Sequence, residues 1–140
     1  MVIDETTEFG ARAARRLREE RVAWLTTVTA AGAPVPSPVW FLWDGADSVT
    51  MYSLDDAPRL RNIEAHPRVS LHFDGDGSGG NIVVLSGRAS IERGVPPAHA
   101  NAAYIEKYGW GFERLRTTPE QFSQRYSVPL RIALERLRGH

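Results

Sequence analysis

The sequence predicts a mainly β protein, a six-stranded antiparallel β-barrel with peripheral helices. Three observations support this fold class. Six segments are rich in β-branched and aromatic residues, short turns containing Gly, Pro or Asp separate several of them, and the helical patterns are short and lie between or outside them. Antiparallel strands in this number usually close into a barrel, because closure removes exposed strand edges.

The N-terminal part of the chain contains one expected helix and two expected strands. Over residues 7–20, apolar side chains from Phe9 to Leu17 recur on one helical face, with arginines on the others. Residues 22–29 are β-branched and aromatic, which is typical of a strand. A Gly/Pro turn separates them from the strand expected over residues 35–43, whose prolines lie near its start, where a strand tolerates them.

The middle of the chain alternates between strand and helix. Residues 44–47 (Asp-Gly-Ala-Asp) predict a hairpin turn, and residues 49–53 predict the third strand. A short helix is expected over residues 57–65 with Pro58 in its first turn. A His-Pro pair ends it, because a residue before Pro avoids the helical region. Residues 68–73 then predict the fourth strand.

The last part of the chain completes the barrel. The glycine-rich residues 74–81 predict a flexible connector and not a nucleotide-binding loop, since no helix follows. Residues 82–91 predict a strand in which Gly87 marks a bulge or bend. Helices are expected over residues 96–108 and from a Thr-Pro cap near position 118. The alternating Leu, Ile and Leu of residues 128–134 predict the closing strand.

The length and the absence of internal boundaries predict a single domain. At 140 residues the chain is long enough to bury a core, and no linker or internal repeat marks a second unit. We therefore expect one domain over residues 1–140, with the N-terminal helix at about 7–20 and the barrel at about 22–135.

The composition excludes several classes of function. Lysine and arginine number 17, aspartate and glutamate number 17, and the pI is near 6.9, so nothing indicates binding to nucleic acid or to an anionic membrane. No apolar run is long enough to span a bilayer, and the acidic N-terminus lacks the apolar region of a signal peptide. Cysteine is absent, and the four histidines lack metal-ligand spacing. We therefore expect a cytoplasmic protein without a metal site.

One segment has the pattern of an anion-binding site. A strand ending in Ser53 is followed by an acidic turn and then by a helix start that carries Arg59 and Arg61. Free backbone N–H groups and the positive end of a helix dipole favour an anion at such a place. Arginine adds forked donors that suit phosphate or carboxylate. The alternative is an ordinary solvated helix.

Four short motifs carry a resemblance to a known family. They are Pro-Val-Trp-Phe at 38–41, Tyr-Ser at 52–53, Arg-Leu-Arg-Asn at 59–62 and Val-Leu-Ser-Gly at 84–87. With the strand order, they resemble the pyridoxamine-phosphate-oxidase-like split-barrel family, and most closely its small branch of deazaflavin (F420)-dependent oxidoreductases. The resemblance implies a six-stranded antiparallel split β-barrel of the FMN-binding type.

The resemblance also implies a cofactor site. Ser53 and Arg59 would hold the cofactor phosphate, Asn62 would brace the helix or loop, and the backbone of residues 39–41 would lie beside the ring. The implied cofactor-binding residues are Val39, Trp40, Phe41, Tyr52, Ser53, Arg59, Leu60, Arg61 and Asn62. No catalytic residue is identified.

The implied activity is hydride transfer from reduced coenzyme F420 to a small, electron-poor unsaturated substrate in a homodimer with shared clefts. The alternatives are an FMN-dependent oxidoreductase and a non-catalytic flavin- or tetrapyrrole-binding protein. Two positions depart from the family pattern. Arg59 replaces the usual lysine, and Pro58 stands where FMN oxidases commonly carry a second basic residue. The lost cation favours F420 over FMN.

Aromatic residues supply further candidates. On a continuous strand, Val39, Phe41 and Trp43 would face one way and Trp40 the other, so a helix, a second subunit or a planar ligand must cover the second row. The aromatic segment 104–112 is either a helix end packed on the barrel mouth or a lid beside the ring. Tyr126 and Arg138 lie in the region that dimers of the family contribute to the shared cleft.

Overall fold

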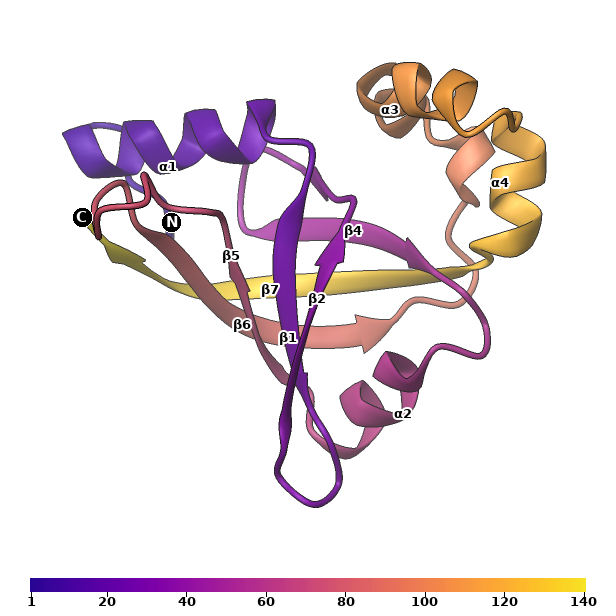
Figure 1. Ribbon diagram of the computed structural model, residues 1–140, viewed down its shortest axis with the longest axis horizontal. Helices are drawn as coiled ribbons and strands as arrows, with labels where there is room; N and C mark the ends of the chain where they lie inside the picture. The colour runs from indigo at the N-terminus through magenta and orange to yellow at the C-terminus, as the bar shows by residue number, and fades with distance from the viewer.

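One antiparallel sheet forms most of the molecule. In the computed structural model, which describes all residues 1–140, it coils into a half-barrel (Figure 1). Its spatial order is β2-β1-β5-β6-β7-β4-β3. The strands are β1 (Ala23–Val28), β2 (Pro34–Val39), β3 (Leu42–Trp43), β4 (Ser48–Ser53), β5 (Arg68–His72), β6 (Val83–Ile91) and β7 (Val128–Gly139). The mainly β fold and the split-barrel architecture expected from the sequence are confirmed.

The sheet has seven strands and not the six expected, because the strand expected over residues 35–43 is broken. Its two parts, β2 and β3, form opposite edges of the sheet, and Trp40 and Phe41 connect them. The inward row nevertheless continues through the break, since Val39, Phe41 and Trp43 all belong to the barrel core. Side-chain alternation therefore gives no sign of the break.

The barrel core is filled by the inward rows of every long strand. Its most enclosed members include Leu25, Met51, Leu71, Leu85 and Ile132, each at most 1% exposed. Helix α1 (Glu8–Glu19) covers one end of the sheet, and both chain termini lie near it (Figure 1). The Thr7 hydroxyl caps α1 by accepting from the Gly10 N–H at 2.9 Å.

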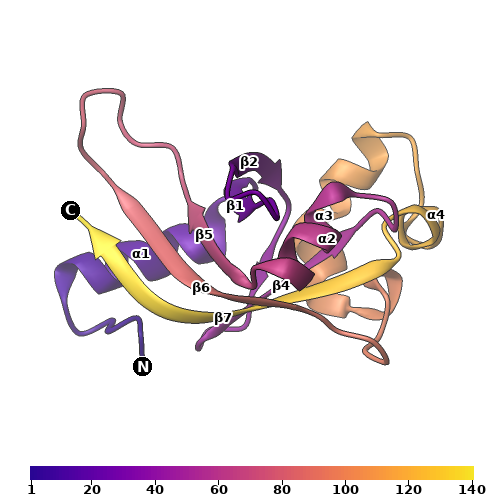
Figure 2. The same cartoon turned by 90° about the horizontal axis from the view of Figure 1, so that it is seen from below.

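The other helices gather at the opposite end of the sheet (Figure 2). Helix α2 (Pro58–Ala65) follows β4, and the 3-10 helix η1 (Ala98–Ala100) precedes α3 (Ala102–Arg114) and α4 (Pro119–Arg125). None of the helices combines the length and the apolar composition needed to cross a membrane.

The helix expected over residues 96–108 is wrong at both ends. Asn101 starts α3 by accepting from the Tyr104 N–H at 3.2 Å, which separates it from the short η1. The helix then continues past Tyr108, its expected end, through Gly109 and Gly111 as far as Arg114. Packing of this segment against Trp40 and α4 outweighs the weak helix propensity of two glycines.

A second, aromatic cluster lies between the sheet and helices α3 and α4. The Trp40 ring stacks on Tyr108 with ring centroids 4.5 Å apart and an interplanar angle of 7°. It also stacks on Phe122 of α4 at 5.7 Å. The outward aromatic of the broken strand is therefore covered by helices of the same chain, one of the three possibilities that the sequence left open.

The long strands β6 and β7 lie where the sequence predicts them, and β7 is longer than expected. The register of their pairing shifts between Ser86 and Gly87, which confirms the bulge expected there. A Cβ on Gly87 would overlap the Ala133 carbonyl oxygen, so only glycine fits. The closing strand β7 runs to Gly139, beyond the expected residue 134, because its last residues pair with the start of β6.

The two glycines of α3 predict opposite stability effects on substitution by alanine. A Cβ on Gly111 would lie 2.5 Å from Cη2 of Trp40, whose ring is held between Tyr108 and Phe122. We expect Gly111→Ala to lower the free energy of unfolding by about 1–3 kcal/mol. A Cβ on Gly109 meets nothing within 4 Å, so Gly109→Ala should raise it by up to about 1 kcal/mol. Urea unfolding of both variants checks this, and the same sign for both would contradict the packing of Trp40.

Candidate functional site

A cavity of about 430 Å³ lies between the sheet edges and the helices α2, α3 and α4. Its volume is in the usual range for small-molecule sites. The ends of β2 and β4, the start of α2 and the inner faces of α3 and α4 form its walls. Its lining residues are Pro38, Val39, Trp40, Tyr52, Ser53, Leu54, Ala57, Arg59, Tyr104, Leu115, Phe122 and Tyr126. Nine of these twelve are hydrophobic, so the cavity suits a largely apolar ligand.

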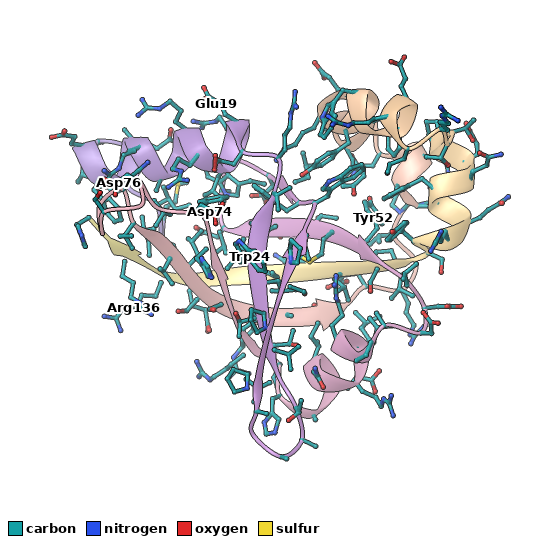
Figure 3. All side chains as sticks on the ribbon, viewed as in Figure 1. Glu19, Trp24, Tyr52, Asp74, Asp76 and Arg136 are labelled. Atoms are coloured by element: carbon teal, nitrogen blue, oxygen red, sulfur yellow. The ribbon has the colours of Figure 1, made fainter.

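The structure brings together five of the nine residues predicted to bind the cofactor. Val39 reaches the cavity from the end of β2 and Trp40 from the connection that follows it, Tyr52 and Ser53 from β4, and Arg59 from α2. β2 and β4 are far apart in the strand order, and the coiling of the sheet brings their ends to one cavity. Figure 3 shows Tyr52 at the end of the molecule that carries α3 and α4.

The other four predicted residues do not line the cavity. Phe41 is fully buried in the barrel core, and Leu60 packs against that core. Arg61 is exposed on α2. Asn62 is buried, and its Nδ2 donates to Thr27 Oγ1 at 3.1 Å, which fastens α2 to β1. This hydrogen bond is the kind of bracing that the resemblance implied for Asn62.

The two C-terminal candidates lie in different places. Tyr126 lines the cavity and stacks on Phe122 with ring centroids 4.5 Å apart. Arg138 pairs with Val84 near the far end of β7, whereas the cavity end of β7 starts at Val128. Arg138 could therefore reach a cavity only in a second copy of the chain.

Arg59 supplies the only charge among the lining residues. Its guanidinium is half-buried and makes one hydrogen bond, from Nη2 to Ser37 Oγ at 3.3 Å, and it has no carboxylate partner. Burial lowers the pKa of Arg59, and the Tyr126 phenol acts in the opposite direction. A cation that is desolvated without a counter-charge is poised to bind an anion.

The backbone adds less to this anion site than the sequence pattern indicates. Helix α2 begins at Pro58, which has no N–H, and the Leu60 N–H donates to the Ala57 carbonyl at 3.1 Å. The Arg59 N–H of the first turn has no recorded partner. The Ser53 hydroxyl donates to the Leu54 carbonyl at 3.1 Å, and rotation about one bond would redirect it to a ligand. In this candidate site the side chain of Arg59 would therefore be the main anion-binding group.

Two residues of α3 hold the strand break beside the cavity. The buried Phe41 N–H donates to Tyr108 Oη at 2.7 Å, and the Tyr108 hydroxyl lies 2.8 Å from the Arg21 carbonyl oxygen. Lys107 Nζ donates to the Phe41 carbonyl at 2.9 Å. These bonds replace the strand pairing that Phe41 lacks. The sequence carried no sign of this role, because it depends on contacts across about 66 residues.

Lys107 predicts a dependence of stability on pH. Burial lowers its pKa from 10.5 to about 8, and Glu20 acts in the opposite direction. Between about pH 8 and pH 10.5, Lys107 is protonated in the unfolded chain but not in the folded protein. The free energy of unfolding therefore rises with pH in this range. Urea unfolding at about pH 7.5 and about pH 9.5 should show a larger increase in unfolding free energy for the wild type than for Lys107→Met. Equal increases would mean that the ammonium group is not desolvated.

Several cavity residues were not predicted from the sequence. Leu54, Ala57, Leu115 and Phe122 are small or apolar residues of ordinary type, and only the tertiary arrangement places them here. Ser37, which accepts from Arg59, lies between two prolines of β2.

No group of three or more His, Cys, Asp or Glu side chains is arranged to hold a metal ion. The acidic residues Asp74 and Asp76 lie at the other end, beside α1 (Figure 3).

Comparisons with known proteins agree with this architecture. A family model described as pyridoxamine 5′-phosphate oxidase matches residues 9–138. A conserved hypothetical protein of Mycobacterium tuberculosis, Rv2991, has a TM-score of 0.68 at 22% identity, covering 94% of this chain and 82% of its own. An F420 reductase has a TM-score of 0.64 at 20% identity, covering 89% and 94%. HutZ, the haem storage protein of Vibrio cholerae, has a TM-score of 0.60 at 21% identity, covering 89% and 90%.

At these identities the structural likenesses show a shared fold. A search of curated proteins found no match. The solved structures with this fold include a reductase and a haem storage protein, so the fold by itself leaves the ligand open.

Proposed function

The chain belongs to the pyridoxamine 5′-phosphate oxidase family, and from this premise we propose that it is an oxidoreductase that binds coenzyme F420 and reduces a small, electron-poor unsaturated substrate. The observation that carries the proposal is the unpaired Arg59 guanidinium at the edge of an aromatic cavity. Such a cavity suits a ligand that carries a phosphate beside a planar ring. The similarity to an F420 reductase supports the same choice.

The residues present fit this coenzyme. Arg59, with Ser53 and Ser37 beside it, would hold the phosphate, and the walls formed by Val39, Trp40 and other aromatic side chains would contact the ring. F420 carries a phosphodiester, which has one negative charge, whereas the phosphomonoester of FMN carries close to two near neutral pH. A single arginine balances one charge, so the lining favours F420 over FMN.

When bound, the reduced coenzyme supplies a hydride equivalent. The protein's own residues would bind, orient and exclude water. Arg59 fixes one end of the ligand, and the peptide of Phe41, held by Lys107 and Tyr108, keeps the adjacent wall in place. The aromatic side chains of α3 and α4 shield the cavity from solvent on one side. Orientation and exclusion of water are the contributions that the family chemistry needs from this site.

Two other ligands remain candidates on the same scaffold. FMN would make the protein a flavin-dependent oxidoreductase, and a tetrapyrrole would make it a binding protein, as the similarity to HutZ allows. The cavity lining contains no His, Cys or Met, and tyrosine is the only side chain in it that can ligate haem iron. This observation favours F420 and FMN over a tetrapyrrole.

Equilibrium binding to the purified protein tests the proposal. F420, FMN and haemin would each be titrated and followed by quenching of tryptophan fluorescence, because Trp40 lines the cavity. We expect tighter binding of F420 than of FMN, and no Soret band shift with haemin at the same concentrations. Preference for FMN would replace the proposed coenzyme, and tight haemin binding would make the protein a tetrapyrrole binder.

We further propose that the protein is a homodimer, as the family resemblance implied. Leu115 supports this, because it lines the cavity and is 59% exposed, and a second copy of the chain would cover this apolar side chain. Light scattering is expected to give about twice the mass of 15.6 kDa with and without F420. A monomer at micromolar concentration would remove the shared cleft from the proposal.

A further inference from the structure

Tyr104 differs from the other buried polar side chains that line the cavity. The Ser53 hydroxyl donates to the Leu54 carbonyl, and the Tyr52 hydroxyl accepts from Asn101 Nδ2 at 2.9 Å. Tyr104 is only 1% exposed, and its hydroxyl makes no hydrogen bond with any group of the protein. Buried hydroxyl groups almost always have a partner, so this one needs an explanation.

The Tyr104 hydroxyl is not fully enclosed by the protein. The side-chain atoms that are fully enclosed without a partner are Arg12 Nε, Asn81 Oδ1 and Trp110 Nε1. The Tyr104 hydroxyl is not one of them, so it keeps part of the small accessible surface of this side chain. Because Tyr104 borders the cavity, we expect that surface to face the space where a ligand would bind.

The surroundings keep this hydroxyl protonated. Burial raises the pKa of Tyr104 well above its ordinary value, and the neighbouring phenols of Tyr108 and Tyr52 act in the same direction. The Tyr52 and Tyr108 rings lie 4.8 Å and 4.9 Å from the Tyr104 ring, centroid to centroid. A neutral donor in such apolar surroundings suits an uncharged acceptor, because a second buried anion would cost far more free energy.

We propose that the Tyr104 hydroxyl is the donor that selects and orients the substrate, and that it binds an uncharged carbonyl or nitro oxygen conjugated to the unsaturated bond. The inference rests on the proposed function, since conjugation to such an oxygen is what makes a double bond electron-poor. The cavity then has two chemically different groups. Arg59 binds the anion of the coenzyme, and Tyr104 binds the neutral oxygen of the second molecule.

Two isosteric probes test this role without any reaction. Acetophenone carries a conjugated carbonyl oxygen, and α-methylstyrene replaces that oxygen by a CH₂ group of similar size. Titrations of the full chain, with and without F420, would be followed by the indole N–H NMR signals of the four tryptophans. We expect the wild type to bind acetophenone about fivefold more tightly, the effect of one neutral hydrogen bond.

Tyr104→Phe is expected to abolish this discrimination while leaving the affinity for F420 and the melting temperature unchanged. Tyr126→Phe, the matched control, removes the other unbonded cavity hydroxyl and should keep the discrimination. Equal affinities of the wild type for the two probes, no measurable binding of either, or discrimination that persists in Tyr104→Phe would overturn the proposal. If the wild type discriminates between the two probes but does not bind F420, the role of Tyr104 is supported and only the proposed coenzyme is contradicted.

Discussion

Replacing Arg59 by methionine is expected to weaken F420 binding by about 10- to 150-fold. A hydrogen bond to a charged group contributes about 1.5–3 kcal/mol, and Arg59 supplies the only positive charge of the cavity lining. Methionine keeps an unbranched apolar stem of similar reach, so the packing around the cavity should survive. Tryptophan quenching by F420 would measure the loss of affinity.

The same substitution should not lower the melting temperature. Arg59 has no carboxylate partner, and burial already disfavours its charged form, so the folded protein gains little from it. Arg59→Lys should recover part of the affinity, because it restores the charge without the forked donors. Arg136→Ala is the matched control, since Arg136 is exposed and distant from Tyr52 (Figure 3). A large loss of stability with unchanged binding would make Arg59 a structural residue.

Replacing Tyr108 by phenylalanine is expected to lower the free energy of unfolding by about 1–3 kcal/mol. The Tyr108 hydroxyl accepts from the buried Phe41 N–H at 2.7 Å, and phenylalanine would leave that N–H without a partner. The ring and its stacking on Trp40 would remain. Thermal and urea unfolding would measure the loss.

Tyr126→Phe makes the same chemical change at a hydroxyl that has no partner in the protein, so its stability should match the wild type. Tyr108→Phe should also weaken ligand binding, because Phe41 follows Val39 and Trp40 of the cavity wall directly. Equal stability of the two variants would show that the strand break does not depend on the Tyr108 hydroxyl.

Much of the fold was predictable because it follows from local patterns. Five of the six expected strands correspond to single strands of the sheet, and the bulge at Gly87 lies where the glycine predicted it. The exception is the strand expected over residues 35–43. Its alternation continues through Trp40 and Phe41, so the pattern could not show that the chain passes there from one sheet edge to the other.

The candidate site was predictable only in part. Ser53 and Arg59 stand out in sequence, because a hydroxyl at a strand end and an arginine in a helix start form a recognisable pattern for anions. Leu60, Arg61 and Asn62 belong to the same motif, yet the helix turns them to the core, to solvent and to β1. A continuous motif cannot distinguish these directions, because they depend on what packs against the helix.

The sequence by itself determined the mainly β class and the family resemblance, and it marked Ser53 and Arg59 as a candidate anion site, since these depend on periodicity and on residue type at short spacing. Only the tertiary structure decided which side chains share the cavity. Tyr104 and Tyr108 are four residues apart on one helix, yet the Tyr108 hydroxyl is bonded to Phe41 whereas Tyr104 lines the cavity. That difference comes from the distant segments packed against α3, whose positions no local pattern encodes.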